Sequence, residues 1–305
     1  MMTRVRPLLV GSMAMATVWA CTTPQVARRD AAARFQSDRI TVTTSGSGPD
    51  VILVPGLASS AADVWAGTIA AVPGYRYHLV QVRGFAGVAA GANGDGGPVV
   101  VPLVEELARY IREARLARPA FIGHSLGGGV GLGLAVRHPG AVSRLMVVDM
   151  VPWMGAYMGP PGTLTPEKAA SVAADTRAAW ETPGDEPWRA RITASVNSMI
   201  RTDSLRPRAI AQGLASDRGV AARAMRDLVL QDHRADLAKV DIPIRVLYVQ
   251  GPHSRLDASQ MDALFRAGYA AAPRVTLQRV ADSYHFIMLD QPARFAEEVR
   301  AFLRR

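Results

Sequence analysis

The sequence predicts an α/β fold in which a mainly parallel, twisted sheet is flanked by helices on both faces. Short apolar runs typical of buried strands alternate with segments of helical period along most of the chain. A glycine-rich turn at residues 123–129 joins one such strand directly to a helix. A long block, residues 152–237, has helical pattern and no clear strand, which predicts a helical cap inserted between two strands of the sheet.

The size of the chain suits one large domain. It has 305 residues, of which 49% are hydrophobic and 20% charged, and this is enough to bury a full core. No fixed-period repeat or low-complexity tract is present, so solenoids and propellers are excluded. We expect the core of the fold to comprise residues 38–151 and 238–305, with the cap at 152–237.

Seven strands are expected. The first alternates apolar and polar residues, as a half-buried strand does, and the second is the short apolar run VILV at residues 51–54. The expected strands are 39–44, 50–55, 77–82, 120–123, 144–149, 244–250 and 274–280. Helical period predicts core helices at 60–71, 102–117, 126–138, 259–271 and 292–303. Within the cap, Thr165 before Pro166 predicts a helix start, and further helices are expected at 187–201 and 206–231.

The N-terminus has the pattern of an export signal. Arg4 and Arg6 precede an apolar stretch, residues 7–20, that is too short to span a bilayer comfortably. Cys21, the only cysteine, follows directly, and the junction resembles a bacterial lipobox, although Trp19 departs from that pattern. We therefore expect a signal peptide at 1–20, a tether at 21–37 and lipidation of Cys21. The product would be exported and anchored to a membrane, in the periplasm or at the outer membrane. The alternative is an ordinary signal peptide with an incidental cysteine.

The positive charge has no nucleic-acid signature. The formal net charge is +9, and nearly all of the basic residues are arginines, since Lys168 and Lys239 are the only lysines. The arginines are dispersed, with no basic run of five or more, and this favours a solvated basic surface. No helix-turn-helix, zinc-finger or RNA-recognition motif accompanies them, so no nucleic-acid partner is expected.

The motif with the clearest chemistry is Gly-His-Ser-Leu-Gly at residues 123–127. It follows an apolar strand and opens a helix, which is the setting of a nucleophile elbow. A serine hydroxyl is a weak nucleophile and must be held exposed beside a base, and a sharp strand-to-helix turn does this. The free N–H groups of the helix start can then face developing negative charge. The pattern indicates Ser125 as a nucleophile.

Three further segments strengthen a resemblance to the α/β-hydrolase superfamily, in its esterase and lipase branch, from about residue 38 to the C-terminus. They are residues 54–57 (VPGL), 83–87 (RGFAG) and 283–292 (SYHFIMLDQP). The resemblance implies an oxyanion hole formed by the main-chain N–H groups of Leu57 and Leu126. Pro55 stands where the family usually has histidine, a mild departure because the hole uses main-chain donors.

The base and the acid of the expected triad differ in how well the sequence defines them. Of six histidines, His285 alone follows the last expected strand and precedes the C-terminal helix, so it is expected to be the base. The usual position of the acid, after the strand at 244–250, holds no carboxylate until Asp257. Asp149, at the end of the preceding strand, is the preferred acid and Asp257 the alternative. Asp282 and Asp290 are expected to brace the histidine loop.

These residues predict a serine hydrolase that cleaves a small carboxylic ester through an acyl-enzyme. No metal or cofactor motif is present, and none is expected to be needed. Trp153 and Tyr157, which follow Asp149, are expected to lie at the substrate pocket. The same fold also carries amidases, peptidases, acyltransferases and cofactor-free peroxidases. Because the usual acid is missing, a decayed site on a surface lipoprotein that only binds a ligand also stays open.

Overall fold

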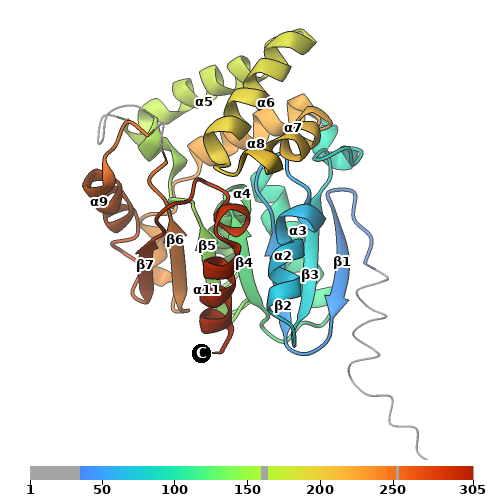
Figure 1. The fold of residues 1–305 in the computed structure, drawn as a ribbon, viewed down its shortest axis with the longest axis vertical. Helices are drawn as coiled ribbons and strands as arrows, with labels where there is room; N and C mark the ends of the chain where they lie inside the picture. The colour runs from blue at the N-terminus through green and yellow to red at the C-terminus, as the bar shows by residue number, and fades with distance from the viewer. Residues whose placement is uncertain (1–34, 159–163, 252–253, 305) are drawn as a thin grey trace, which may run out of the picture.

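The computed structural model describes residues 35–158, 164–251 and 254–304. They form a seven-stranded sheet in the order β1-β3-β2-β4-β5-β6-β7 (Figure 1). The strands are β1 (Ile40–Gly46), β2 (Asp50–Val54), β3 (Arg76–Val82), β4 (Ala120–His124), β5 (Arg144–Val148), β6 (Ile244–Tyr248) and β7 (Val275–Arg279). Only β1 runs antiparallel, against β3, and the other neighbouring pairs are parallel. The predicted mainly parallel α/β architecture is confirmed.

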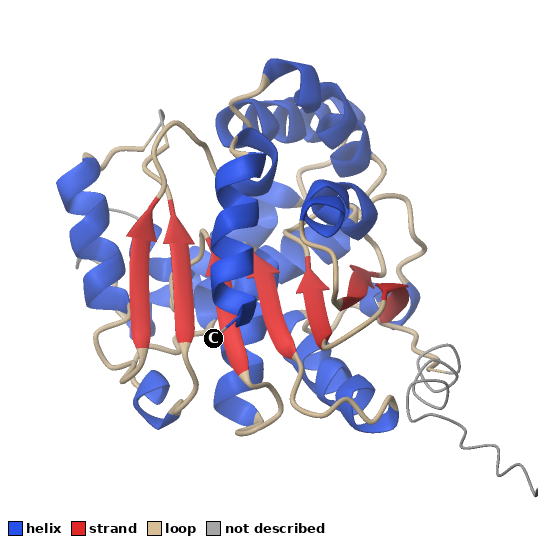
Figure 2. Cartoon of the chain, turned by 60° about the horizontal axis from the view of Figure 1, so that its bottom comes forward, coloured by secondary structure: helices blue, strands red, loops and turns tan. Residues whose placement is uncertain are grey.

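Helices cover both faces of the sheet (Figure 2). Successive side chains of β2 point to opposite faces, so Val51 and Leu53 join one apolar cluster while Ile52 and Val54 join the other. The first cluster includes side chains of α2 (Ala61–Ala71) and α11 (Pro292–Arg304). The second includes side chains of α3 (Val100–Glu113), α4 (Leu126–Arg137) and α9 (Ala258–Gly268). Burial on both faces explains why these strands read as continuous apolar runs.

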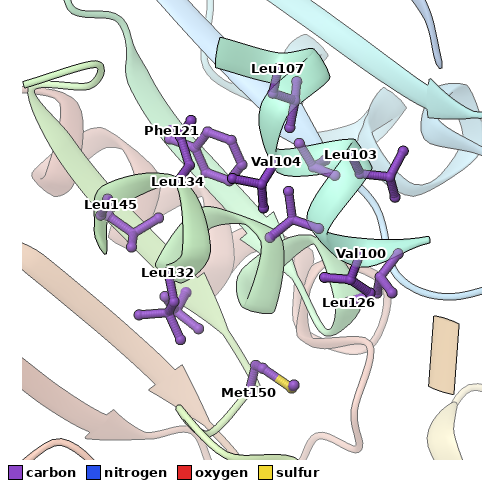
Figure 3. Close-up of a cluster of buried hydrophobic side chains, with 14 of the residues drawn as sticks. Val100, Leu103, Val104, Leu107, Phe121, Leu126, Leu132, Leu134, Leu145 and Met150 are labelled. Carbon is purple, nitrogen blue, oxygen red and sulfur yellow. The ribbon is translucent and has the colours of Figure 1, made fainter. Parts of the chain in front are cut away.

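Packing beneath α4 fixes the position of the predicted nucleophile. Leu134 of α4 lies with Phe121 of β4 and with Leu103 and Leu107 of α3 in one buried cluster (Figure 3). Each of these leucines is at most 1% exposed, and full burial of such a side chain contributes about 1.5–3 kcal/mol. Because Ser125 is the N-cap residue of α4, this packing holds the serine at the carboxyl end of β4.

The segment between β5 and β6 lies over the carboxyl ends of the strands (Figure 1). Its described residues form four α-helices and no strand: α5 (Pro166–Trp180), α6 (Asp185–Met199), α7 (Arg206–Leu214) and α8 (Arg218–Leu230). The shorter helices of the chain are η1 (Gly91–Gly94), η2 (Met154–Tyr157), η3 (Asp203–Leu205), η4 (Asp236–Lys239) and α10 (Ile287–Asp290).

The single helix expected at 206–231 is wrong, because the chain breaks between α7 and α8. Asp217 is the N-cap of α8, and its carboxylate accepts a hydrogen bond from the N–H of Val220 at 2.8 Å. The N–H of Asp217 donates to the carbonyl of Gly84 at 2.7 Å. The cap and the hydrogen bond to Gly84 stabilise a new helix start at Asp217, and they outweigh the apolar periodicity that favours one continuous helix.

The predicted signal segment, Cys21 and residues 21–34 of the tether predicted at 21–37 lie outside the described residues. Within the described part of the chain, no helix has the length and apolar character needed to cross a bilayer.

Candidate active site

Ser125 lies in a tight turn between β4 and α4. Its backbone has φ 52° and ψ −116°, a conformation that glycine adopts far more readily than serine. A side chain at Gly127 would place its Cβ 2.2 Å from the carbonyl oxygen of Val54, and one at Gly123 would lie 2.2 Å from the carbonyl oxygen of Gly127. The two flanking glycines are therefore required by close backbone contact, as the motif predicts.

His285 pairs with Asp149. The Nδ1 atom of His285 lies 2.6 Å from Oδ2 of Asp149, so the ring donates this hydrogen and leaves Nε2 free to act as a base. The second oxygen of Asp149 accepts a hydrogen bond from the N–H of Val249 at 3.1 Å. His285 stands on the loop between β7 and α10, and Asp149 directly follows β5. The two side chains are 19% and 11% exposed, so the hydrogen-bonded pair is largely shielded from solvent but still accessible.

The alternative acid occupies another position. Asp257 is the N-cap of α9, where its carboxylate accepts from the N–H of Gln260 in a full capping box. Asp290 braces the histidine loop, as expected, because it accepts hydrogen bonds from the N–H groups of Tyr284, Arg201 and Thr202. Of the two weighed carboxylates, the structure brings Asp149 to His285.

His124 connects the serine turn to the histidine loop. Its Nε2 donates to the carbonyl oxygen of His285 at 3.1 Å, and the two rings pack with centroids 4.6 Å apart. Complete burial, and then the neighbouring His285, hold the pKa of His124 well below its ordinary value, so this ring stays neutral. Since His124 precedes Ser125 in the chain, the contact ties the histidine loop to the residue next to the serine.

The main chain at Leu57 lies beside the serine turn. A Cβ added at Gly56 would meet Nδ1 of His124 at 2.9 Å and Cβ of Ser125 at 3.3 Å, so this loop passes directly over Ser125. Leu126 is the first residue of α4, and its N–H therefore has no partner within that helix. The structure brings both predicted oxyanion residues to the neighbourhood of Ser125.

Two cap residues that no sequence pattern indicates hold the loops after β2 and β3. The side-chain oxygen of Gln212 accepts from the N–H of Ser60 at 3.1 Å. The hydroxyl of Ser216 donates to the carbonyl of Gln212 at 2.9 Å and accepts from the N–H of Ala86 at 2.9 Å. Because Gln212 lies 152 residues from Ser60 in the chain, no local pattern points to the contact.

Strained backbone gathers around the candidate site. Ala58, Ser125, Asp149 and Asp282 have φ between 52° and 56°, although none of them is glycine. They belong to the four loops that carry the oxyanion segment, the serine, the acid and the histidine. Such conformations cost about 1–3 kcal/mol each and persist where the surrounding packing enforces them, often at active sites.

Trp153 lines a hollow of about 540 Å³ between the start of the cap and α9, whereas Tyr157 is not part of that lining. Arg234 lines the hollow as well, and its guanidinium lies 4.3 Å from the Trp153 ring centre. The Trp153 indole N–H donates a hydrogen bond to the carbonyl of Val229 at 2.8 Å.

The hydroxyl of Tyr157 lies 3.6 Å from the sulfur of Met261 on α9. Burial, and then the nearby Asp149, raise the pKa of Tyr157 well above its ordinary value. Neither Ser125 nor His285 lines this hollow.

Within the described residues, no group of three histidine, cysteine or acidic side chains could hold a metal ion. The chemistry available on the described side chains is that of a serine hydroxyl, an imidazole paired with a carboxylate, and main-chain N–H groups. This set suits acyl transfer.

Comparisons with known proteins agree with the fold. A pimeloyl-[acyl-carrier protein] methyl ester esterase of Vibrio atlanticus (strain LGP32) is 31% identical over 125 residues, which are 41% of this chain and 45% of the relative. A putative carbamate hydrolase, RutD, of Yersinia enterocolitica (serotype O:8 / biotype 1B) is 31% identical over 114 residues, 37% of this chain and 40% of that protein. The chain thus matches less than half the length of these curated relatives.

Similarity at the level of structure extends further. An esterase of Exiguobacterium antarcticum superposes with a TM-score of 0.70 and 17% identity, covering 87% of this chain and 96% of that one. At this identity the likeness concerns the fold. The alpha/beta hydrolase family profile matches residues 51–298, which include the serine turn, Asp149 and His285. The chain is a member of the alpha/beta hydrolase family.

Proposed function

We propose that this hydrolase is a serine esterase, with Ser125 as nucleophile, His285 as base and Asp149 as the acid that orients it. The observation that carries the proposal is the 2.6 Å contact between His285 Nδ1 and Asp149 Oδ2, beside a serine in a strained strand-to-helix turn. A carboxylate at Nδ1 fixes the tautomer in which Nε2 accepts a proton, and it stabilises the imidazolium formed during acyl transfer.

The first half of the reaction follows from these positions. Ser125 Oγ attacks the ester carbonyl carbon while its proton passes to Nε2 of His285. The carbonyl oxygen becomes an oxyanion that accepts hydrogen bonds from the N–H groups of Leu57 and Leu126. The tetrahedral intermediate then collapses, the C–O bond to the alcohol breaks, and His285 returns the proton to the departing alcohol. Ser125 is left acylated.

The second half releases the acid. Water attacks the acyl carbonyl carbon while His285 takes one of its protons, and the same N–H groups hold the second oxyanion. Collapse breaks the bond to Ser125 Oγ, which recovers its proton from His285. The carboxylic acid leaves, and no cofactor takes part.

Ester cleavage is favoured over the other acyl-transfer reactions by the first of the two relatives named above. The Vibrio protein is named as a methyl ester esterase, and its similarity extends over two fifths of this chain. The test is hydrolysis of short p-nitrophenyl esters by the purified protein, with an amide and a carbamate of the same acyl group as comparisons. Labelling by a fluorophosphonate, followed by mass spectrometry, should place the adduct on Ser125. Absence of both turnover and labelling would contradict the proposal.

We also propose that Trp153 and Tyr157 influence which acyl chains are accepted. They follow the acid by a few residues; Trp153 lines the 540 Å³ hollow, and the hydroxyl of Tyr157 contacts Met261 of α9. Tyr157→Ala and Trp153→Phe should each shift the ratio of kcat/KM between butyrate and octanoate esters by at least about three-fold. A ratio unchanged in both variants would contradict this role.

The export proposal rests on the N-terminal sequence. We propose that residues 1–20 are removed, that Cys21 becomes lipidated, and that the enzyme is held at a membrane in the periplasm or at the outer membrane. Mass spectrometry of the protein from the membrane fraction should find a diacylglyceryl group on an N-terminal Cys21. A mature N-terminus at any other residue would contradict the anchor.

A further inference from the structure

Basic side chains gather at the edge of the sheet opposite Ser125, where the parallel strands begin. This edge comes toward the viewer in Figure 2. The fold brings there the ends of α3, α4 and α11 and the segments that lead into β4, β5, β6 and β7. We call this surface the basic face, and it comprises Arg112, Arg115, Arg118, Arg137, Arg144, Lys239, Arg274 and Arg304.

Carboxylates pair with three members of the basic face: Glu105 with Arg137, Asp236 with Lys239 and Asp241 with Arg274. Glu113 pairs with Arg109, which is outside the face. The excess positive charge of the face therefore comes from its other members. Within the described residues, Arg112, Arg115 and Arg118 are exposed and have no ion-pair partner. The end of α3 and its connection to β4 therefore present three positive charges to the solvent.

The backbone of that connection is unusual for arginine. Arg115 has φ 52° and Arg118 has φ 51°, the left-handed region in which glycine and asparagine are the favoured residues. Arg115 and Arg118 are thus held in a backbone conformation that costs free energy, as are the left-handed residues around Ser125.

Three hollows lie along the face, and the carboxylates in their lining are paired with arginines: Asp50 with Arg76, Asp241 with Arg274 and Glu298 with Arg245. The first, of about 140 Å³, has Arg118, His138 and Lys239 in its lining. The second, of about 210 Å³, shares Arg118 and adds Arg144. The third, of about 510 Å³, shares Arg144 and adds Arg274. Guanidinium groups beside adjoining hollows suit phosphate groups, because arginine binds phosphate oxygens through several N–H donors at once.

We propose that the basic face binds the anionic headgroups of a phospholipid membrane, so that the opposite edge of the sheet, which carries Ser125, points away from the bilayer. Charge complementarity supports this partner, since basic clusters near an anionic bilayer are attracted to it. The place where the described chain begins also supports it. The Phe35 ring packs against Tyr110 at 4.9 Å and lies under the Arg109 guanidinium at 4.4 Å, in the last turns of α3.

Tyr110, which Phe35 contacts, is two residues before Arg112 of the basic face at the end of α3. Cys21 is 14 residues before Phe35, so a fully extended connection would span at most about 50 Å. If Cys21 carries lipid, as proposed above, the tether keeps this side of the molecule near the bilayer. Headgroup binding itself rests on the described charges and not on the lipid.

The experiment uses the full chain with Cys21→Ser, so that acylation plays no part. Two matched triple variants are compared: Arg112→Gln with Arg115→Asn and Arg118→Asn on the basic face, and Arg189→Gln with Arg191→Gln and Arg255→Gln on the opposite side. Both lower the formal net charge from +9 to +6, and asparagine suits the two left-handed positions.

Co-sedimentation with phosphatidylcholine vesicles, with and without about 30% phosphatidylglycerol, is measured at about 0.1 M salt. The apolar N-terminal segment is common to all proteins, and neutral vesicles report its contribution.

We expect phosphatidylglycerol to increase binding of the parent protein to vesicles. In the basic-face variant this increase should be smaller by at least about ten-fold, and in the control variant by less than about three-fold. Equal losses in the two variants, or binding independent of phosphatidylglycerol, would overturn the proposal. A parent that binds single-stranded RNA through this face but not the anionic vesicles would also overturn it, in favour of nucleic acid. Ester hydrolysis is assayed in parallel, so a failure of the proposed activity is seen separately from a failure of headgroup binding.

Discussion

Ser125 holds a backbone conformation that suits glycine better than serine, with φ 52° and ψ −116°. The hydroxyl is therefore presented at a local cost, and substitutions at this position separate chemistry from stability. Ser125→Ala should lower kcat/KM by at least about 10⁴-fold and change the free energy of unfolding little. Ser125→Gly should be equally inactive but more stable than Ser125→Ala by about 1 kcal/mol.

Ester hydrolysis and urea unfolding measure the two effects of these substitutions. Fluorophosphonate labelling that survives in Ser125→Ala would rule out this serine as the nucleophile. A glycine variant less stable than the alanine variant would show that the turn carries no strain.

Asp149 is the second residue whose contacts make a sharp prediction. Asp149→Asn preserves shape but removes the charge beside His285 Nδ1, and the amide can stabilise the wrong imidazole tautomer. We expect kcat to fall by about 10³–10⁴-fold in steady-state assays, as losing this carboxylate does in the serine-protease template.

Asp257→Asn is the matched control for that loss. Asparagine caps a helix about as well as aspartate, so neither the capping box of α9 nor kcat should change. Equal losses of kcat in the two variants would contradict the role of Asp149.

At the scale of elements, one cap helix is joined to the core by a buried carboxylate. Oδ2 of Asp227, on α8, accepts hydrogen bonds from the N–H groups of Val99 at 2.6 Å and Val100 at 3.1 Å, where α3 begins. Arg223, one turn earlier, donates to the carbonyl of Asn93 next to the same helix start. The cap is thus part of the folded core on this side.

Asp227→Ala removes the acceptor for two buried N–H groups and should lower the free energy of unfolding by about 2 kcal/mol. Asp227→Asn keeps an acceptor oxygen and should lose about half as much. Chemical denaturation of the three proteins measures this. A loss of the same size in both variants would mean that the charge matters, and not the capping hydrogen bonds.

The elements also show where sequence patterns were sufficient. Period-two alternation and short apolar runs predicted seven strands near their observed positions, because each strand buries its own side chains locally. The turn at Ser125 and the loop of His285 were identified because their neighbours in sequence define them. The break between α7 and α8 was missed, since Asp217 is tied to Gly84, far away in the chain.

For the whole molecule, a buried ionic cluster at the start of β2 and β3 makes stability depend on pH. Asp50 lies 2.6 Å from Arg76 Nε and 3.1 Å from His78 Nε2, and its side chain is 6% exposed. Burial alone would raise the pKa of Asp50, but the hydrogen bonds from His78 and Arg76 outweigh it and lower the pKa below its ordinary value. The carboxylate therefore stabilises the fold above about pH 4, the unfolded value, and this is lost as pH falls through the lower folded value.

Asp50→Asn leaves the buried Arg76 without its counter-charge. The free energy of unfolding should fall by about 3 kcal/mol at pH 7, and the difference from the parent should narrow below about pH 4. Urea unfolding at several pH values measures it. A difference that stays constant down to pH 3 would contradict the ionic origin of the effect.

What the sequence left open concerns contacts made over long distances in the chain. Whether Asp149 or Asp257 meets His285 depends on how segments 136 residues apart come together, and no local pattern encodes that. The hydrogen bond from the Ser60 N–H, in the loop after Leu57, to Gln212 likewise has no local sequence pattern that predicts it. Arginines that are dispersed along the chain likewise gather on one face only after the parallel strands align their starting points.

The strained loops around Ser125 have a consequence for directed evolution of this enzyme. Four residues at about 1–3 kcal/mol each amount to several kcal/mol, which is comparable with the entire stability of a typical domain. A library built on the parent would therefore lose many variants to misfolding before their selectivity could be scored. Ala58→Gly and Asp282→Gly relieve left-handed positions outside the Ser125, His285 and Asp149 side chains. A starting template with these changes would tolerate a wider range of new pockets.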